Sequence, residues 1–487
     1  MKRSVTLYLI GKILLVEASL LLLPVIVGLF YRESWQQISS YMGVACLVAL
    51  VGLALSWRKP SNFKVRARDG LVTVSLGWIL LSVFGALPLV LTGEIPHFVD
   101  AVFEIASGFT TTGSSILSDL SLLQHSSLFW RSFTHLVGGM GVLVFTLAIL
   151  PNSSDYVELM RAEVPGPIFG KLVSKVGRTA RILYGIYIAM TFILIVALIL
   201  AKVPVFDAML LAFGTAGTGG FGVDNAGFAI YQNQAAVEWL IGIGMLLFGV
   251  NFNVYYFILL GYAKDILKSD EELRYYFLIV IGATVLICLR LAQSYDAVEP
   301  LLRQVFFTVA SLITTTGFAT VDYAQWPLVT HIILLALMFI GGCAGSTAGG
   351  LKVSRIVMYL KCAFVELKRV GQPKRKLVPM LSGKAISKSI EAQIASYLLV
   401  YIVGFLMILL SVSFEVPDFT TAFSSVAATF NNIGPGLGQV GPTANFSFYS
   451  DWNKLVLALG MIAGRLEIFP IILLFSPKTI RRLILDK

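Results

Sequence analysis

The stretch ASGFTTTGSS, residues 106–115, has a close counterpart in ASLITTTGFA, residues 310–319. In both, Thr-Thr-Thr-Gly follows a short apolar run. A single repetition is compatible with chance. The two stretches indicate an internal repeat only if further copies of the motif occur elsewhere in the sequence.

The composition places this series in a membrane protein. The chain has 487 residues, of which 57% are hydrophobic and 13% charged. Continuous apolar runs recur from end to end, without the alternation expected of a membrane β-barrel. The first run, residues 8–31, follows Lys2 and Arg3 but is too long for a signal peptide. We therefore predict an all-α polytopic membrane protein with no separate soluble domain.

The basic residues predict the orientation of the chain. The net charge is +10, and 29 of the 37 Lys and Arg residues fall in six places. These places are the extreme N-terminus and residues 58–68, 161–181, 264–274, 352–388 and 478–487. By the positive-inside rule they are cytoplasmic, so both termini are expected inside a bacterial inner membrane. The same charges suit contact with anionic membrane lipid, and no nucleic-acid role is needed.

Apolar runs long enough to span a membrane occur about ten times. They lie near residues 8–31, 40–57, 71–92, 127–150, 183–203, 236–263, 275–293, 327–360, 394–414 and 454–476. Four shorter semi-apolar stretches follow spanning runs on the outside: 97–109, 205–216, 301–313 and 417–430. Each ends in a Gly-containing turn and is followed by another spanning run. Short helices of this kind are tolerated at membrane depth only when protein or a water-filled cavity surrounds them.

The four short stretches align without gaps, and this completes the series. The segments are DAVFEIASGFTTTGSS (100–115), DAMLLAFGTAGTGGFG (207–222), QVFFTVASLITTTGFA (304–319) and TAFSSVAATFNNIGPG (421–436). One column holds Gly113, Gly220, Gly317 and Gly434, and two residues earlier stand Thr111, Thr218, Thr315 and Asn432. An internal repeat of roughly a hundred residues is therefore present, with all copies running the same way around an axis along the membrane normal.

This repeat predicts five parts of the chain. Two extra N-terminal helices (1–66) precede four units, each made of a helix, a half-helix, a turn and a second helix. The units are residues 67–155, 156–265, 266–375, which includes a Gly-rich loop, and 376–487.

Four such turns around one axis can bind a dehydrated cation through backbone oxygens. Glycine allows successive carbonyl groups to point the same way, and stacked rings of carbonyl oxygens can replace the water shell of K⁺. Each half-helix also directs its negative C-terminal end toward the centre. The alternative for any single turn is a tight reversal between helices. The predicted ion-binding residues are Thr110, Thr111, Thr112, Gly113, Thr218, Gly219, Gly220, Thr314, Thr315, Thr316, Gly317, Asn431, Asn432, Ile433 and Gly434.

These turns resemble the selectivity-filter loops of the Trk/Ktr/HKT superfamily of potassium transporters, with one glycine per loop. Two extra helices before the first unit make the chain most similar to the bacterial TrkH/TrkG type. The resemblance implies K⁺ uptake, with Rb⁺ also accepted, because members with Ser in the first loop admit Na⁺ and this chain has Gly113 there. It also implies a homodimer and a cytosolic, TrkA-like regulatory ring that binds NAD, ATP or ADP. The basic segment 352–388 is the expected docking surface for that ring.

A second stretch, GGCAGSTAGGLK (341–352), interrupts the apolar run 327–360. Its small residues form helices poorly, so it reads either as a broken helix whose loop crosses the conduction path or as a close helix-packing patch. The resemblance favours an intramembrane gate made of Gly341, Gly342, Gly345, Ser346, Thr347, Gly349 and Gly350. The run HLVGGMGVLV (135–144) is its weaker counterpart in the first unit, where helix packing is the preferred interpretation.

Charges inside apolar runs mark further candidates. Arg465 lies in the last span, where the resemblance makes it a positive barrier beside the Gly-rich loop. An internal ion pair with Glu467 or another acid is the alternative. For Lys12 and Glu17 in the first span, packing or snorkelling is expected rather than a role in conduction.

Three aspartates are candidates for the outer mouth. Asp119, Asp224 and Asp322 follow the first three aligned glycines and either gather cations there or cap loops. The fourth turn lacks a matching acid, so any such ring is incomplete.

The sequence suggests no enzyme and no organic cofactor, because no spacing of His, Cys, Ser or carboxylates predicts catalysis. The four cysteines are scattered and suggest neither disulfides nor a metal site. Four other functions are compatible with an apolar chain of this kind: a less selective Na⁺/K⁺ pathway, a proton-coupled K⁺ symporter, a polytopic membrane enzyme or lipid-handling protein, and an alternating-access carrier for organic solutes. The enzyme or lipid-handling protein would require intramembrane catalytic acids or clusters of His or Cys, which the sequence lacks. The carrier would require inverted or sixfold repeats rather than four half-helices.

Overall fold

The computed structural model describes residues 5–60, 67–141, 176–224, 227–372, 375 and 377–477. Within these residues the chain is almost entirely helical, with one β-hairpin of β1 (Met380–Leu381) and β2 (Lys384–Ala385). Parts of the basic segments that were expected to be cytoplasmic lie outside the described residues, namely 1–4, 61–66, 161–175 and 478–487. The end of one predicted span, residues 142–150, lies outside them too. The α-helices are α1 (Val5–Leu20), α2 (Leu22–Phe30), α3 (Trp35–Ser56), α4 (Ala67–Thr92), α5 (Phe98–Phe109), α6 (His125–Gly139), α9 (Val176–Leu200), α10 (Val205–Gly217), α11 (Ala235–Phe248), α12 (Phe252–Leu259), α13 (Ala263–Ser269), α14 (Glu271–Leu291), α15 (Val298–Ile313), α16 (Leu328–Ile340), α17 (Val353–Gly371), α18 (Lys388–Ser413), α19 (Phe419–Phe430), α20 (Asp451–Arg465) and α21 (Phe469–Leu474).

Six helical segments of the described residues are long and apolar enough to cross a bilayer. They are α1 with α2, α3, α4, α9, α14 and α18. Large apolar side chains on these helices are exposed, among them Leu50, Phe192, Leu278 and Met407. An exposed apolar belt of this extent is what hydrocarbon chains solvate, so the chain is an all-α polytopic membrane protein.

Four units follow α1–α3, and each contains a half-helix: α5, α10, α15 and α19. These helices have 12, 13, 16 and 12 residues. At 1.5 Å per residue a 12-residue helix is about 18 Å long, too short for a hydrocarbon core of about 30 Å. They are buried in protein instead: in α5 every residue from Ala101 to Phe109 is buried. The predicted half-helices are therefore present, with ends shifted by at most three residues.

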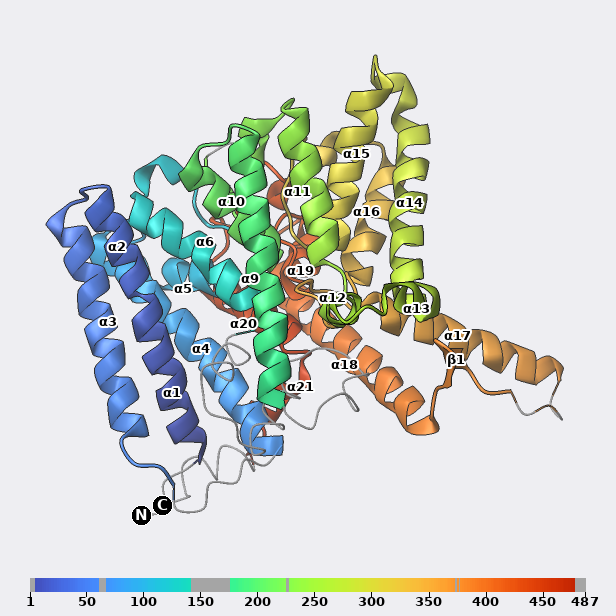
Figure 1. Ribbon diagram of the computed structural model, residues 1–487, viewed down its shortest axis with the longest axis horizontal. Coiled ribbons are helices and arrows are strands. Elements are labelled where there is room, and N and C mark those ends of the chain that lie inside the picture. Colours follow the sequence, from blue (N-terminus) through green and yellow to red (C-terminus); the bar gives the residue numbers. More distant parts are fainter. Residues whose placement is uncertain are drawn as a thin grey trace.

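The units form a closed ring. Within each unit, the first helix packs on its own half-helix, as in α4 with α5 and α14 with α15. Between units, the second helix packs on the next half-helix. The contacts run from α6 to α10, from α11 to α15, from α16 to α19, and from α20 back to α5. Because the last contact returns to the first unit, four sequential repeats enclose one axis, and α1–α3 lie at one side (Figure 1).

Side chains at the starts of helices fix several of these boundaries. Ser34, Asp270, Ser387 and Ser450 each accept a hydrogen bond from an amide in the first turn of the helix that follows. Asp418 does the same for α19, accepting from the amides of Thr420 and Thr421. The hydrogen bond from the Thr421 amide, followed by that from its hydroxyl, lowers the pKa of Asp418. This cap therefore stabilises the helix above the carboxyl's unfolded pKa and is lost at lower pH.

The second helices of the units are broken, which corrects the prediction of continuous spans over 236–263 and 454–476. The axes of α11 and α12 differ by 89°. Between α20 and α21 the backbone of Glu467 and Ile468 has positive φ values of 59° and 66°. In the third unit the Gly-rich loop separates α16 from α17, as predicted. In the first unit α6 ends at Gly139, inside the predicted span 127–150.

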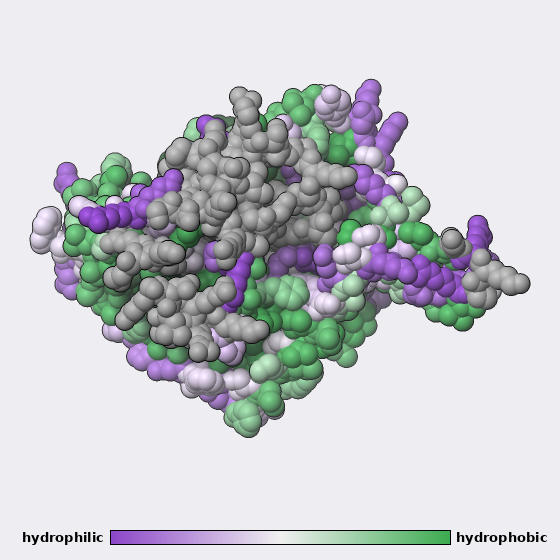
Figure 2. Space-filling model, turned by 90° about the horizontal axis from the view of Figure 1, so that it is seen from below, coloured by the Kyte–Doolittle hydropathy of each residue, from purple (hydrophilic) through white to green (hydrophobic). Residues whose placement is uncertain are grey.

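The helix α17 projects from the body of the molecule (Figure 1). Viewed from below, the projecting arm carries many hydrophilic side chains (Figure 2). The last turn of α17 contains Lys368 and Arg369. Leu360, Phe364 and Leu367 on the same helix are exposed.

Candidate functional site

The four half-helices end in the same hydrogen-bonded turn. In each, the amide of the residue before the aligned glycine donates to a carbonyl oxygen five residues earlier, always at 2.8 Å. The donor and acceptor pairs are Thr112 with Ser107, Gly219 with Gly214, Thr316 with Ser311, and Ile433 with Ala428. The preceding amide donates to the carbonyl three residues before it, at 3.0–3.2 Å. Together these bonds form a Schellman motif, which ends a helix and reverses the chain. The gapless alignment thus corresponds to a common backbone conformation, and we call these segments the half-helix turns.

Two residues of each half-helix turn have left-handed backbone geometry. The aligned glycines have φ values between 75° and 102°. Two residues earlier, Thr111, Thr218, Thr315 and Asn432 have φ values between 55° and 58°. Threonine is β-branched and rarely adopts this conformation, which costs on the order of 1–3 kcal/mol per residue. Strain of this kind persists only where the surrounding packing enforces it, and it is typical of functional sites.

The aligned glycines join the half-helix turns to one another. A Cβ atom on Gly113, Gly220 or Gly317 would overlap a carbonyl oxygen of the next unit, and one on Gly434 would lie 2.8 Å from a carbonyl oxygen of the first unit. The oxygens belong, in the same order, to Gly219, Thr316, Ile433 and Thr112. All four are the residues directly before an aligned glycine. The backbone of each turn therefore touches the next one, and the four carbonyl groups form a closed ring.

Threonine hydroxyls brace the first and third turns in the same way. Thr110 Oγ1 donates to the carbonyl of Ala106 at 2.6 Å and lies 2.7 Å from Thr112 Oγ1. In the third turn, Thr314 and Thr316 repeat both contacts at 2.6 and 2.8 Å. These hydroxyls face back onto their own half-helix, so they support the backbone. Thr111 Oγ1 is buried and has no hydrogen-bond partner among the described residues.

The fourth turn is braced differently because asparagines replace the threonines. Tyr401 donates to Asn431 Oδ1 at 2.7 Å, and Asn431 Nδ2 donates to the Ala427 carbonyl at 3.0 Å. Asn432 Nδ2 donates to Thr112 Oγ1 of the first turn at 2.9 Å. The longer side chains thus reach neighbouring elements that a threonine hydroxyl would not.

A buried ion pair between α5 and α6 binds the chain segments that follow the first two turns, and it was not predicted from the sequence. Arg131 Nε of α6 and Glu104 Oε1 of α5 are 2.5 Å apart. Glu104 also accepts from the amide of Ile116 at 3.0 Å, and Arg131 Nη1 donates to the carbonyl of Gly222 at 3.1 Å. The pair therefore connects the chain segments that leave the first and second turns. Glu104 and Arg131 are distant in sequence, so no local pattern marks them.

The Gly-rich loop, residues 341–350, is closed at its base. The amides of Leu351, Lys352 and Val353 donate to the carbonyls of Phe339, Ile340 and Gly342 at 2.9–3.0 Å. Its two ends therefore lie side by side, as in an Ω-loop. The residues predicted for the gate, from Gly341 to Gly350, therefore all lie within one closed loop.

The Gly-rich loop contacts three units. The Gly349 amide donates to Thr315 Oγ1 of the third turn at 2.6 Å. A Cβ atom on Gly349 would overlap the carbonyl oxygen of Asn431, so the loop also touches the fourth turn. At its other end, the Cys343 amide donates to the carbonyl of Gly249, at the break between α11 and α12, at 3.0 Å. The loop is thus packed directly against the ring of turns.

Arg465 connects this loop with the first unit. Its Nη1 donates to the carbonyl of Thr347 at 2.6 Å, and its Nη2 donates to the carbonyls of Gly138 and Gly139 at 2.7 and 2.6 Å. The acceptors in α6 are carbonyls of its last turn, where a cation is favoured by the helix dipole. Glu467, the alternative partner, pairs with Arg355 of α17 at 2.6 Å.

Within the run 135–144, the described residues 135–141 form both a helix end and a packing site. Gly141 has a φ value of 78°, just after α6 ends. Cβ atoms on Gly138 and Gly139 would clash with Phe109 and with Gly217, at the ends of α5 and α10. The preferred interpretation of helix packing therefore describes these glycines, but the helix also stops here.

The predicted outer aspartates bind backbone amides. Asp119 accepts from the Ser121 amide at 2.9 Å, and Asp322 from the Ala324 amide at 3.1 Å, each at the start of a short 3₁₀ helix. The carbonyl of Asp224 accepts from Gly227 at 2.7 Å. These contacts agree with the loop-cap alternative for Asp119 and Asp322.

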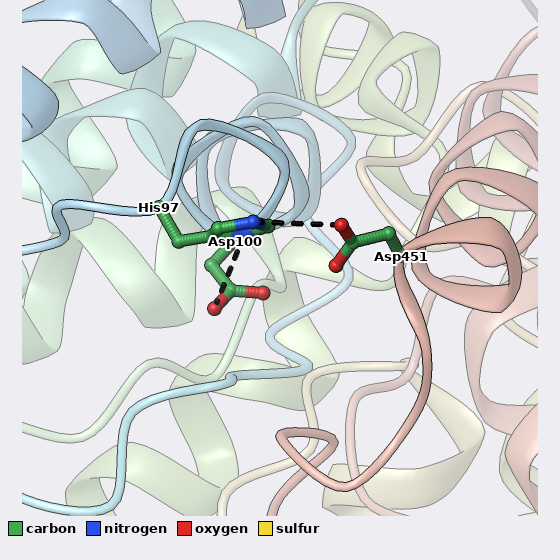
Figure 3. Close-up of side chains that lie close together, drawn as sticks. All are labelled: His97, Asp100 and Asp451. Atoms are coloured by element: carbon green, nitrogen blue, oxygen red, sulfur yellow. Dashed lines mark ion pairs between the residues drawn. The ribbon is translucent and has the colours of Figure 1, made fainter.

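A side-chain cluster joins the last unit to the first on the surface (Figure 3). His97 lies 3.4 Å from Asp451 and 3.8 Å from Asp100. Asp100 also binds Lys454 Nζ at 2.5 Å. Because a lysine already occupies Asp100, we interpret this cluster as an ion-pair contact between α5 and α20.

Of the charged residues of α1, Glu17 lies next to α4 and α5, because a Cβ atom on Gly85 would be 3.4 Å from Glu17 Oε1 and 3.1 Å from Phe109 Cε2. Lys12 Nζ lies 5.7 Å from the ring centre of Tyr8. Glu17 is fully buried, and its oxygens have no hydrogen-bond partner among the residues described.

Comparison with known proteins gives a consistent result. Residues 37–481 match the family model TrkH, described as a cation transport protein. The chain is 36% identical to the Trk system potassium uptake protein TrkH of Salmonella typhimurium, over 96% of this chain and 97% of that protein. It is 33% identical to the Trk system potassium uptake protein TrkG of Escherichia coli K12, over 93% of each. The crystal structure of the potassium transporter TrkH from Vibrio parahaemolyticus matches 98% of this chain and all of that chain, with a TM-score of 0.87 and 31% identity.

Proposed function

The chain belongs to the TrkH family of cation transport proteins, and from this premise we propose that it takes up K⁺ across the bacterial cytoplasmic membrane through the ring of half-helix turns. The observation that carries this proposal is the contact of each aligned glycine with the carbonyl oxygen of the next unit. Only a closed ring of backbone groups from four units offers an ion the same ligands on every side.

The backbone carbonyls act as the ligands of the ion. Entering the ring costs K⁺ its water shell, and oxygens of fixed dipoles compensate for that loss. The half-helix turns contain no carboxylate, so the ion meets partial charges and can leave again. The C-terminal ends of α5, α10, α15 and α19 add negative potential at the same place. The buried hydroxyl of Thr111 has no hydrogen-bond partner among the described residues, so its oxygen is available to an ion.

The Gly-rich loop and Arg465 act together as the gate. The loop is bound to the third turn through Gly349 and to Arg465 through Thr347. A guanidinium group beside the ring repels an approaching cation, and a loop fixed against the ring narrows the path. Flux then requires both to move.

A cytosolic nucleotide-binding ring docks on the basic segment 352–388. This segment includes α17, which projects from the body and carries Lys361, Lys368 and Arg369.

The exposed apolar residues of α17, Leu360, Phe364 and Leu367, suit a second copy of the chain in a homodimer. By the positive-inside rule, the basic residues at the two ends of the sequence favour a cytoplasmic orientation for both.

The ion path is tested by Gly113→Ser. A Cβ atom at this position overlaps the carbonyl oxygen of Gly219, and the φ value of 80° strains any residue but glycine. The first turn must therefore move and widen the ring. We expect discrimination between ⁸⁶Rb⁺ and Na⁺ in proteoliposome uptake to fall about tenfold, equivalent to about 1.4 kcal/mol.

The control is Gly43→Ser in α3, because a Cβ at Gly43 would meet no atom within 4 Å in the part of the chain that the structure describes. It should discriminate as the wild type does. A folded Gly113→Ser protein with unchanged Rb⁺/Na⁺ discrimination would contradict the assignment of the ring as the selective site.

A further inference from the structure

A buried carboxylate lies against the Gly-rich loop from a different helix. Glu272 belongs to the first turn of α14 and is 5% exposed. In the sequence it is one of three consecutive acids, Asp270, Glu271 and Glu272, which look like an ordinary helix start. Asp270 does cap α14, by accepting from the Leu273 amide at 3.1 Å. Glu272 faces the protein interior instead, and it needs another explanation.

One oxygen of Glu272 binds both the loop and the helix that follows it. Glu272 Oε1 accepts from the Ala344 amide at 2.7 Å and from the Ser354 amide at 3.0 Å. Ala344 lies in the Gly-rich loop, and Ser354 is the second residue of α17. The carboxylate thus fixes the position of the loop relative to the start of α17.

The chemistry of the start of α17 explains why a carboxylate is present. The first amides of a helix lack acceptors within the helix, and they form the positive end of its dipole. Lys352, the residue at the N-cap, provides no capping bond from its side chain. Glu272 supplies that acceptor from α14, and a charged acceptor makes a stronger hydrogen bond than a neutral one.

The contacts divide the loop into two halves. The half near Gly349 is held by Thr315 and by Arg465, through Thr347. The half near Ala344 is held by Glu272 and by the break between α11 and α12. Without Glu272, the buried amides of Ala344 and Ser354 lose their acceptor. A buried amide without a partner raises the free energy of the conformation that buries it. The half of the loop near Ala344 would then be the one to move.

We propose that Glu272 is a positioning residue that holds the half of the Gly-rich loop near Ala344 against the start of α17. Its effect on ion flux rests on the proposed function of this loop as a gate. Its effect on the position of the loop does not.

The test uses a cysteine that the loop already contains. Cys343 is 1% exposed and directly precedes Ala344. The other cysteines, Cys46, Cys288 and Cys362, are replaced by serine, so that a small thiol-reactive methanethiosulfonate reports on the loop alone. The full-length protein in proteoliposomes is labelled, and ⁸⁶Rb⁺ uptake is measured in parallel without any partner.

Glu272→Ala should label at Cys343 at least tenfold faster than the unchanged Glu272 protein and should take up more ⁸⁶Rb⁺. Glu272→Gln keeps one acceptor oxygen in neutral form, so its labelling rate should lie between the two. The control is Glu271→Gln, because Glu271 pairs with Lys361 and does not contact the loop in the structure. It should label at the original rate.

Equal labelling in Glu272→Ala and the parent would overturn the proposal, as would the same increase in Glu271→Gln. Faster labelling with unchanged uptake would support the positioning role and contradict the gate. If Glu272→Ala fails to fold, Glu272→Gln decides alone: labelling at the parent rate overturns the proposal.

Discussion

At the scale of single residues, the site depends on backbone atoms that the sequence indicates only indirectly. The aligned glycines could be predicted, because a column of four glycines in register marks backbone geometry that other residues avoid. The directions in which the threonine hydroxyls point could not be predicted. Thr110 faces its own half-helix, whereas Thr315 accepts from the Gly-rich loop. Side-chain direction follows from packing between distant units, which no local pattern reports.

Arg465 gives the prediction that belongs to this scale. Arg465→Ala removes both a positive charge and three hydrogen bonds to Thr347, Gly138 and Gly139, so uptake of ⁸⁶Rb⁺ without a partner should rise about tenfold or more. Arg465→Lys keeps the charge but lacks the forked donor geometry, so its flux should rise less. A folded Arg465→Ala protein with flux equal to or below that of the wild type would refute the role of this residue in the gate.

At the scale of elements, the half-helices were predicted closely and the helix breaks only in part. A half-helix has a clear signal, namely a short semi-apolar run followed by a glycine turn. The Gly-rich loop also has one, since small residues interrupt an apolar run. The other two breaks carry local signals that the prediction of continuous spans overlooked: Asn251 caps the start of α12, and Pro470 lies in the first turn of α21. At the first of these breaks the Cys343 amide of the Gly-rich loop donates to the Gly249 carbonyl, so a contact from a distant part of the chain adds to the local signal.

The contact between the Gly-rich loop and the fourth turn is testable by Gly349→Ala. The added methyl group overlaps the carbonyl oxygen of Asn431 and lies 3.2 Å from Asn432 Cβ. The loop should move away from the ring, so partner-free ⁸⁶Rb⁺ uptake should increase several-fold. Gly371→Ala is the matched control, because a Cβ there meets none of the described residues within 4 Å. An increase in the control as large as that in Gly349→Ala would argue against this contact.

At the scale of the whole molecule, one chain builds a ring that closes between its last and first units. The α20–α5 contact makes this closure, and it carries Lys454 and Asp100 as well as the exposed His97 and Asp451. The repeat in the sequence predicted four units around an axis. It did not predict which contact closes the ring, because the pairing of Asp100 with Lys454 spans most of the chain.

The closure can be weakened without touching the half-helix turns. Lys454 is only 7% exposed at its side chain, so Lys454→Met leaves Asp100 without its cation in a partly buried place. We expect the melting temperature of the detergent-solubilised protein to fall by a few degrees, equivalent to about 1–2 kcal/mol for a partly buried pair. Lys264→Met, at an exposed position in α13, should leave it unchanged. Equal melting temperatures for the two variants would show that this pair does not support the ring.

The most direct test of the central claim is to locate the ion itself. Crystals of the protein grown in Tl⁺, an anomalously scattering substitute for K⁺, should show anomalous density inside the ring formed by the carbonyl oxygens of Thr112, Gly219, Thr316 and Ile433. Tl⁺ density found only at carboxylates elsewhere, with none inside this ring, would contradict the account.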